Sequence, residues 1–377
     1  MEKKKILILS ALIAALLVLL LVALLIPKNS SQTPDPTVES TEPSQAATAA
    51  PTEESTEEPS EATTEEATQA TLPDSSTIRN PLNGSLLEAK YDGRIFAVSI
   101  NNSKSALPFH GVSQADILFE MYVNEYATRC MALFSNVAEV ESIGSIRSTR
   151  YNFTDISLAY DCIMSHASCS EVVRKDMIAS GIDQMNVDGA IGYRDYKRYN
   201  NQGYAWEHCL FAQGSELVSA AAKKGFALSK PDRDYGLNFV EDATPPDGRD
   251  AQKIDIVFTI GGHKKTSTMQ YDETTGKYIF WQYNKKMTDQ NNGADVAFTN
   301  VIVMLAKNTN EGIYHIADLS GQGEGYFACG GKIVPIYWIH KNETDPFTFY
   351  QMDGTPLSLG VGTTYIAIAP TGSPINY

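Results

Sequence analysis

The stretch Ile143–His166, which reads IGSIRSTRYNFTDISLAYDCIMSH, contains the pattern on which the N-terminal half of the chain depends. A polar loop at 144–150 is followed by apolar residues at helical spacing over 151–160 and by a short apolar strand over 161–166. The same reading predicts strands at 94–100, 115–123 and 127–134 and helices at 171–179 and 215–224. This alternation of strand, loop and helix predicts an α/β domain.

The loop at 144–150 concentrates hydroxyl and guanidinium groups. These groups belong to Ser145, Arg147, Ser148, Thr149 and Arg150. An anion would find there fixed positive charges, hydroxyl donors and the free N–H groups of a helix N-terminus. Ligand sites in open α/β sheets lie beyond the carboxyl ends of strands, so we expect this loop and His166 at one edge of the sheet. Arg129 and Arg194, which also fall at predicted strand ends or loops, complete the predicted ligand-binding set.

Two histidines and one carboxylate are candidates for chemistry at the same place. His166, His208 and Asp195 are the predicted catalytic residues, because a histidine near a carboxylate and an arginine can act as a general base. Ser145 and Ser148 lack the Gly-x-Ser-x-Gly elbow of a nucleophilic serine. No H-x-x-H or H-x-E spacing favours a metal, and no cofactor is predicted.

A structural role for the arginines is the alternative to a binding site. Arg147 and Arg150 would then form ion pairs with Asp116, Glu120 or Asp155 and fix the loop. Because structural ion pairs are common in proteins, the sequence leaves both interpretations open.

The N-terminal 78 residues differ in composition from the rest. Residues 6–26 are an apolar run broken only by Ser10 and preceded by three lysines, which predicts an uncleaved signal anchor after a cytoplasmic tip at 1–5. Residues 27–78, rich in Thr, Glu, Ser and Pro, predict a disordered acidic linker. The anchor predicts a single-pass protein of the cell membrane with its folded part outside the cytoplasm.

Charge narrows the possible partners. The whole chain has a formal net charge of −15, of which −10 lies in residues 28–77, where eleven acidic residues face one lysine. The cytoplasmic tip contributes +2, which leaves −7 for the part from Ile78 onward. This absence of a basic excess argues against nucleic acid as a partner.

The sequence of the C-terminal part, 252–377, predicts a β-rich domain. A folded N-terminal domain at 79–227 and a Pro-, Asp- and Gly-rich connection at 228–251 precede it. Gly321-Gln-Gly-Glu-Gly325 is predicted to be a glycine-rich turn rather than a nucleotide-binding loop, because a strand follows it instead of a helix. Five scattered cysteines predict no disulfide framework, although Cys162 and Cys169 are close enough in sequence to pair.

Motifs in this order resemble the YerB-like family of bacterial, mainly Gram-positive, envelope proteins. The matching stretches include Asn80-Pro-Leu-Asn-Gly84, Gly111-Val-Ser-Gln-Ala-Asp-Ile117, Ile143–Arg150, Ser165-His166, Tyr193-Arg-Asp195, Phe298–Val303 and Gly321–Tyr326. The resemblance covers nearly all of residues 80–370. It implies two extracytoplasmic domains of unknown function and brings no established reaction with it.

Two departures from the family are informative. Family members are often lipoproteins, whereas this chain has no lipid-attachment cysteine after its apolar run. Where the family resemblance implies Gly-Gly after the histidine, this chain has Ala167-Ser168.

Three functions therefore remain open. The first is binding of an anionic envelope polymer, such as a cell-wall glycan or a phosphodiester polymer, through the arginines. The second is hydrolysis of such a polymer with a histidine base. The third is a protein–protein adaptor that uses the β-rich domain, with the arginines purely structural.

Overall fold

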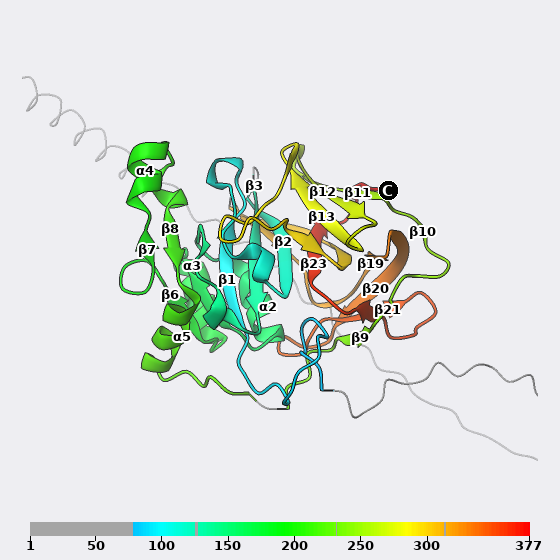
Figure 1. The fold of residues 1–377 in the computed structure, drawn as a ribbon, viewed down its shortest axis with the longest axis horizontal. Helices are drawn as coiled ribbons and strands as arrows, with labels where there is room; N and C mark the ends of the chain where they lie inside the picture. The colour runs from blue at the N-terminus through cyan, green and yellow to red at the C-terminus, as the bar shows by residue number, and fades with distance from the viewer. Residues whose placement is uncertain (1–77, 125–126, 231, 313) are drawn as a thin grey trace, which may run out of the picture. The chain divides into compact units, whose positions relative to one another are not determined.

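The computed structural model describes residues 78–377 except 125, 126, 231 and 313 (Figure 1). The predicted anchor at 6–26 and the predicted linker up to residue 77 lie outside these residues. Within the described part, no helix is both long and apolar enough to cross a membrane.

A large mixed sheet runs through both halves of the described chain. Its strands are β1 (Phe96–Asn101), β2 (Ile117–Asn124), β3 (Ala127–Phe134), β5 (Ile163–His166), β6 (Gln184–Asn186), β10 (Arg249–Asp250), β16 (Asn300–Ala306), β19 (Gly321–Cys329), β20 (Lys332–His340), β21 (Thr348–Gln351) and β23 (Thr364–Pro370). They form an eleven-stranded sheet in the order β10-β20-β19-β16-β23-β2-β3-β1-β5-β6, with β21 paired to β20. The N-terminal part is therefore not a purely parallel sheet, since β3 pairs antiparallel with both β1 and β2.

Strand β23, near the C-terminus, joins the two halves. It lies between β16 and β2 and is parallel to both, with Ile117 opposite Thr364 and Met121 opposite Ile368. All seven residues of β23 are buried, as expected for a parallel strand covered on both faces. The stretches predicted as two separate domains thus share one sheet, with N-terminal strands on one side of the joint and C-terminal strands on the other (Figure 1).

A second sheet packs against one face of the first. It has the order β14-β13-β12-β11-β24, with β15 paired to β13, and its strands are β11 (Lys253–Ile260), β12 (His263–Asp272), β13 (Lys277–Gln282), β14 (Lys285–Lys286), β15 (Ala297–Phe298) and β24 (Ile375–Asn376). Phe258, Phe280 and Phe298 from this sheet belong to one buried core with Tyr365 of β23. Alternate residues of β11 and β13 are buried, so one face of each strand meets this core.

Short strand pairs complete the sheets. They are β4 (Ile143–Gly144), β7 (Tyr193–Arg194) and β8 (Leu210–Ala212) in one group, β9 (Asn238–Val240) with β22 (Ser358–Gly360), and β17 (Asn308–Glu311) with β18 (Tyr314–Ala317). The predicted connection at 228–251 therefore contains two short strands, β9 and β10.

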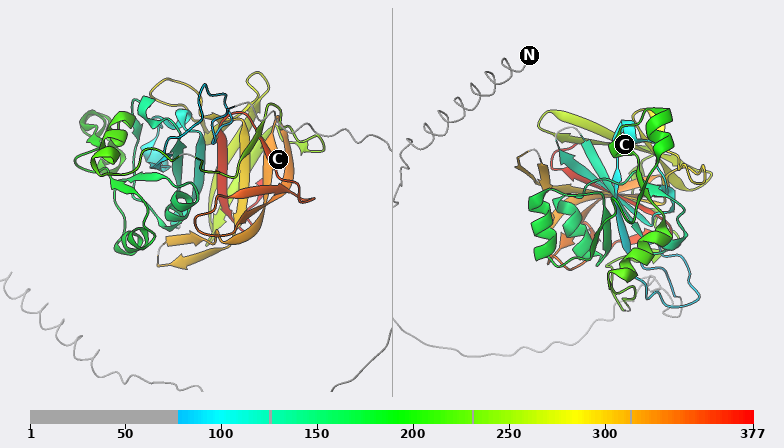
Figure 2. Two further views of the ribbon diagram at one scale, coloured as in Figure 1. Left: turned by 90° about the horizontal axis from the view of Figure 1, so that it is seen from below. Right: turned by 90° about the vertical axis from the view of Figure 1, so that its left-hand side faces the viewer.

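Helices occur in the N-terminal half, where Figure 2 shows them grouped away from the yellow-to-red strands. They are α2 (Tyr151–Ala159), α3 (Glu171–Ala179), α4 (Tyr196–Gln202) and α5 (Gly214–Lys223), with 3-10 turns η1 (Lys104–Ala106), η2 (Val112–Gln114), η3 (Val137–Glu139) and η4 (Trp206–His208). The helices predicted at 151–160 and 171–179 are confirmed, and Ser170 caps α3 by accepting from the Val173 N–H at 3.4 Å. Helices α2 and α3 contribute Phe153 and Met177 to a second core with Phe119 of β2.

Two local predictions are wrong. The glycine-rich segment from Gly321 is not a turn but the first half of β19, paired with β20. Its glycines allow close packing, because a Cβ on Gly323 would lie 2.5 Å from the Trp338 ring and one on Gly325 only 2.1 Å from the Val303 carbonyl oxygen. The Tyr-, Asn- and Gly-rich composition of the segment after Asp195 predicts a loop, but its residues 196–202 form helix α4, for which Asp195 supplies the N-cap.

All five cysteines are within the described residues and none forms a disulfide. Burial raises the pKa of the Cys162 thiol above its ordinary range and also raises the pKa of Cys169. These thiols are therefore small buried or half-buried side chains of low reactivity.

A buried ion pair links the two sheets. Glu120 of β2 is fully buried and pairs with Lys265 of β12. Four neutral groups also donate to this carboxylate, namely Asn102 (2.9 Å), Thr128 (2.6 Å), Ser267 (2.7 Å) and Tyr365 (2.6 Å). Burial would raise the pKa of Glu120, but Lys265 and these hydrogen bonds outweigh it, so the pKa lies below its ordinary value.

Candidate functional site

The segment 144–150 lies across the carboxyl ends of β1 and β5. The Asn101 N–H donates to the Ser145 carbonyl at 2.9 Å, and the Arg147 N–H donates to the Ser99 carbonyl at 2.9 Å. The Arg147 carbonyl in turn accepts from the Ala167 N–H at 3.0 Å, just beyond β5. Backbone hydrogen bonds thus fix the loop at the sheet edge where strands β1 and β5 end.

Three arginines converge on this edge, and we call Arg129, Arg147 and Arg150 the arginine cluster. Arg129 lies near the start of β3, opposite Asn101 of β1, and its Nη1 donates to the Ser148 carbonyl at 2.5 Å. Burial lowers the pKa of all three guanidinium groups. The charges of Arg150 and Arg147 further lower the pKa of Arg129, which shows that the three cations lie within electrostatic reach of one another.

The cluster has no carboxylate partner among the described residues. None of its members forms an ion pair there, and the Nε of each is buried without a hydrogen-bond partner in this part of the chain. Among the described residues, the hydrogen-bond and ring contacts of Arg147 and Arg150 are with neutral groups. Arg147 Nη1 donates to the Glu207 carbonyl at 3.4 Å, Arg150 Nη1 donates to the Thr149 carbonyl at 2.7 Å, and the Arg150 guanidinium lies 5.1 Å from the centre of the Tyr314 ring. The Glu207 carboxylate is near enough to raise the pKa of Arg147, but no carboxylate of the described residues pairs directly with any of the three cations, so a bound anion would stabilise the cluster.

The three carboxylates proposed as structural partners of the arginines are engaged elsewhere. Asp116 accepts from the Ser135 N–H at 2.6 Å, Glu120 pairs with Lys265, and Asp155 accepts from Asn152 at 2.9 Å. The structural alternative in this form is therefore wrong.

Asp155 supplies a testable pH dependence. Burial raises the pKa of this carboxyl from 3.8 to about 6. Because the pKa is raised in the folded state, the protonated form is favoured, and stability is lost as the pH rises from about 4 through 6. Relative to an Asp155→Asn variant, we expect the wild-type chain to lose about 1–2 kcal/mol over that interval, a figure reduced for the partial exposure of the group. Urea unfolding of both chains from pH 4 to 8 measures their difference in stability. If that difference did not change with pH, the prediction would be contradicted.

His166 has both ring nitrogens engaged. Its Nδ1 lies 3.1 Å from the Ser168 carbonyl and its Nε2 lies 2.8 Å from the side-chain amide of Gln184. Both partners present an oxygen that accepts, the Ser168 carbonyl and the Gln184 Oε1, so each contact is made by an N–H of the ring; the neutral ring donates to one of them and the imidazolium to both. Burial lowers the pKa of His166 and favours this neutral form. The geometry gives His166 a role in holding the end of β5 rather than a free lone pair for a substrate.

His208 lies in a Ser–His–Asn arrangement. Its Nε2 is 3.0 Å from Ser105 Oγ and its Nδ1 is 2.8 Å from Asn101 Nδ2. The Asn101 Oδ1 accepts from the Ser103 N–H at 3.2 Å, so its Nδ2 faces the histidine and donates to Nδ1. The proton of neutral His208 is therefore on Nε2, which donates to Ser105 instead of withdrawing its proton. This tautomer does not activate a serine nucleophile.

Arg194 and Asp195 stabilise their own segment. Arg194 forms an ion pair with Asp188 at 2.5 Å and donates to the Trp206 carbonyl at 2.8 Å. Asp195 caps α4 by accepting from the Arg198 N–H at 3.0 Å. Arg194 nevertheless lies near the cluster, since its charge lowers the pKa of Arg147.

Ser145 and Ser148, both predicted to bind the ligand, differ in the hydrogen bonding of their hydroxyl groups. Ser145 Oγ is buried and has no hydrogen-bond partner among the described residues, whereas Ser148 Oγ lies 2.8 Å from Ser168 Oγ at the surface. Ser148 also contributes its carbonyl to Arg129, so it orients the cluster through its backbone.

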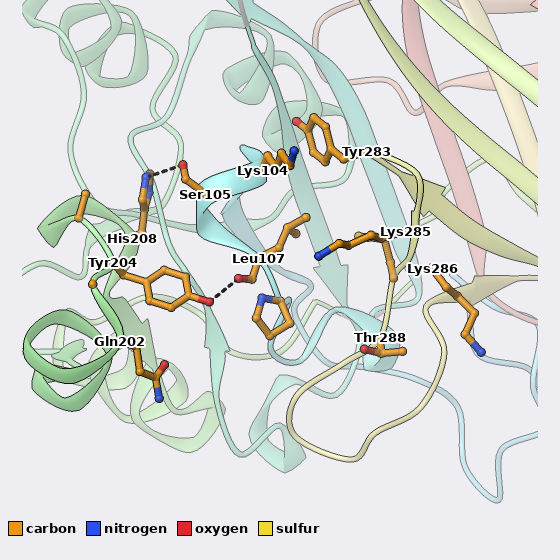
Figure 3. A pocket seen from close by; sticks show the side chains of 14 residues that line it. Lys104, Ser105, Leu107, Gln202, Tyr204, His208, Tyr283, Lys285, Lys286 and Thr288 are labelled. Carbon is orange, nitrogen blue, oxygen red and sulfur yellow. Dashed lines mark hydrogen bonds between the residues drawn. The ribbon is translucent and has the colours of Figure 1, made fainter.

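A pocket that the sequence did not reveal lies beside His208. It has a volume of about 760 Å³ and is formed by the loop at 104–108, the segment 202–208 and the strand turn 283–288 (Figure 3). Lys104, Lys285 and Lys286 contribute positive charge, and we call it the lysine pocket. Lys286 pairs with Asp295 at 2.8 Å, while Lys104 and Lys285 form no ion pair with a described residue. Lys104 is about 180 positions from Lys285 and Lys286 in sequence, so no local motif could have predicted that they line one pocket.

No group of three or more His, Cys, Asp and Glu side chains in the described part of the chain has the geometry to hold a metal ion. The positive charges of the cluster and the pocket instead favour an anionic ligand.

Fold and site together define a two-domain, sheet-rich protein with a cationic edge on its shared sheet. Residues 82–227 match the N-terminal domain, and residues 255–366 the C-terminal domain, of a protein of unknown function (DUF3048). The chain belongs to the YerB-like family, as the resemblance of its motifs predicted.

Two comparisons support this membership. The protein named "Putative lipoprotein YerB" of Bacillus subtilis (strain 168) is 27% identical over 315 residues, which cover 79% of this chain and 88% of the relative. The crystal structure of YerB from Bacillus subtilis superposes with a TM-score of 0.68 at 24% identity and covers 80% of this chain and 100% of that one. The structure shows a shared fold, and the family's domains bring no assigned activity.

Proposed function

We propose that this chain is a membrane-anchored extracytoplasmic protein that binds an anionic ligand of the cell envelope. The observation that carries the proposal is the arginine cluster, three partly or fully buried guanidinium groups with no carboxylate partner among the described residues. Buried cations are expected to be paired, and here the available partner is an external anion. The apolar run at 6–26 and the name of the Bacillus subtilis relative favour a location at the membrane.

Binding is favoured over hydrolysis because neither histidine offers a base. His166 uses both ring nitrogens within the protein, and the proton of His208 is on the nitrogen that faces Ser105. Hydrolysis would require a base with a free lone pair toward the substrate.

A double substitution tests the proposed function. Arg147 and Arg150 are the appropriate pair, because Arg129 also supports the loop through the Ser148 carbonyl. With inorganic polyphosphate as the probe, we expect Arg147→Gln/Arg150→Gln to weaken binding about 100-fold, since each charge-assisted hydrogen bond contributes about 1.5–3 kcal/mol. Calorimetry on the full-length chain at two salt concentrations measures the affinity, which should also fall as salt rises.

The control is Arg174→Gln, which removes an exposed arginine that is ion-paired with Glu171 on α3. It should leave polyphosphate binding unchanged. In the absence of ligand, the double variant should be as stable as the wild type or more stable, because like charges have been removed. Full affinity in the double variant, or its unfolding without ligand, would show that the arginines are structural.

A further inference from the structure

The exposed aromatic side chains of the described residues are gathered in one segment, 193–206. Tyr193, Tyr196, Tyr199 and Trp206 are 44%, 62%, 42% and 40% exposed, and we call the last three, whose rings contact one another, the aromatic patch. The other large apolar side chains with comparable exposure are aliphatic and scattered, namely Ile78, Leu86, Val172, Ile178 and Met352. Exposed aromatic residues that cluster in this way mark a binding surface.

The patch is held in place before any ligand binds. The Trp206 ring lies 5.6 Å from the Tyr196 ring and 5.2 Å from the Tyr199 ring, in tilted and edge-on arrangements. The Arg194 guanidinium group lies 4.8 Å from the centre of the Trp206 ring and also donates to its carbonyl. Asp195 caps the helix that carries both tyrosines. A ligand therefore meets rings that are already oriented, which reduces the entropy lost on binding.

The aromatic patch lies next to both the arginine cluster and the lysine pocket. Arg147 contacts the carbonyl of Glu207, the residue after Trp206, so the arginine cluster lies beside it. On the other side, Tyr204, Ala205 and His208 of the same segment line the lysine pocket. A ligand seated on the aromatic rings would thus have its charged groups next to one or both sets of cations.

The chemistry of the segment favours a sugar over an apolar partner. Its exposed apolar surface comes from Tyr and Trp, whose rings also carry polar groups, and it exposes no Leu, Ile, Val or Met. Exposed amide side chains follow directly on α4, at Asn200, Asn201 and Gln202. The C–H face of a pyranose ring packs on the electron-rich face of an aromatic ring, while amides and phenols hydrogen-bond its hydroxyls.

We propose that the ligand is an anionic glycan, whose sugar rings pack on the aromatic patch while its acidic groups bind the arginine cluster. This inference rests on the proposed function and names the chemical class of its ligand.

Three probes separate the contributions of sugar and charge. They are hyaluronate, which carries carboxylates on a sugar chain, inorganic polyphosphate, which carries charge without sugar, and dextran, which carries sugar without charge. For the full-length chain, we expect hyaluronate to bind more tightly than either of the others at equal salt. Trp206→Ala should weaken hyaluronate binding about tenfold and leave polyphosphate binding within twofold.

Trp206 is the first residue of η4, so a second variant controls for a rearrangement of that turn by the Trp206 substitution. Tyr196→Ala/Tyr199→Ala removes two rings of the patch from α4 and should again weaken hyaluronate but not polyphosphate. Tyr350→Ala, which removes one ring of the stacked pair with Tyr337 on β20 and β21, is the matched control and should change neither.

The outcomes distinguish this inference from the proposed function. Equal losses for hyaluronate and polyphosphate, or no loss in either aromatic variant, would overturn the glycan assignment and leave anion binding intact. Binding of phosphatidylcholine vesicles that depends on Trp206 would also overturn it, in favour of a membrane surface. Failure of every polyanion to bind would overturn the proposed function itself.

Discussion

Replacing Lys265 by methionine is expected to lower the free energy of unfolding by about 3–5 kcal/mol, because it leaves the Glu120 carboxylate buried without its counter-ion. Glu120 is fully buried, so water cannot compensate for the lost ammonium group. The neutral donors Asn102, Thr128, Ser267 and Tyr365 would remain, but their hydrogen bonds do not neutralise the charge. Urea unfolding at pH 7, followed by far-UV circular dichroism, measures the change.

The pH dependence and a second variant identify the cause. Because the pKa of Glu120 is lowered in the folded wild type, its contribution to stability is present above the ordinary value of 4.5 and is lost as the pH falls through the folded value. In Lys265→Met, burial is opposed only by the neutral hydrogen bonds and favours the protonated acid, so the difference between the two chains should shrink as the pH falls. Glu120→Gln/Lys265→Met should recover at least half of the lost stability. A double variant as unstable as the single one would show that packing around Lys265 matters more than charge.

Gly144→Ala is expected to destabilise the chain by about 3 kcal/mol and to weaken anion binding as well. A Cβ at this position would lie 2.5 Å from a ring carbon of Phe211 and 3.0 Å from the Leu210 carbonyl oxygen, at a backbone φ of +156°. Overpacking of this kind costs about 1–3 kcal/mol, and the unfavourable backbone conformation adds about 1 kcal/mol. Relief of the clash would move the start of the loop 144–150 and with it Arg147.

Gly203→Ala is the matched comparison. Gly203 also has a positive φ, +72°, but no heavy atom lies within 4 Å of a Cβ built there. It should therefore show the backbone cost alone, about 1 kcal/mol. Equal effects of the two substitutions on unfolding and on polyphosphate binding would argue against a role for the Phe211 contact in positioning the loop.

Local sequence signals predicted many of the individual elements. Residues at helical spacing predicted α2 and α3, and apolar runs predicted β1, β2 and β3. These features depend on neighbours within a few residues. The pairing of β2 with β23 joins residues almost 250 positions apart, and no periodicity specifies it. The sequence therefore predicted two domains, at 79–227 and 252–377, but not that their strands share one continuous sheet.

The contrast between local sequence signals and long-range contacts also applies to the candidate site. The convergence of Arg129, Arg147 and Arg150 could be predicted, because strand ends place the loop 144–150 and the start of β3 at one edge. The hydrogen-bond partners that decide the role of each histidine could not. Gln184 and Asn101 are ordinary polar residues in sequence, and only the structure shows that they occupy a ring nitrogen of His166 and of His208, respectively.

The position of β23 determines when, during synthesis, strand β2 can complete its pairing. Strand β2 is made early, but the neighbour that covers its edge from Ile117 to Met121 is Thr364–Ile368, which emerges only when synthesis is almost complete. Until then, a nascent chain presents an unpaired, apolar strand edge that invites pairing with other chains. The joint that unites the finished sheet thus leaves this edge of β2 without its partner until Thr364–Ile368 has been made.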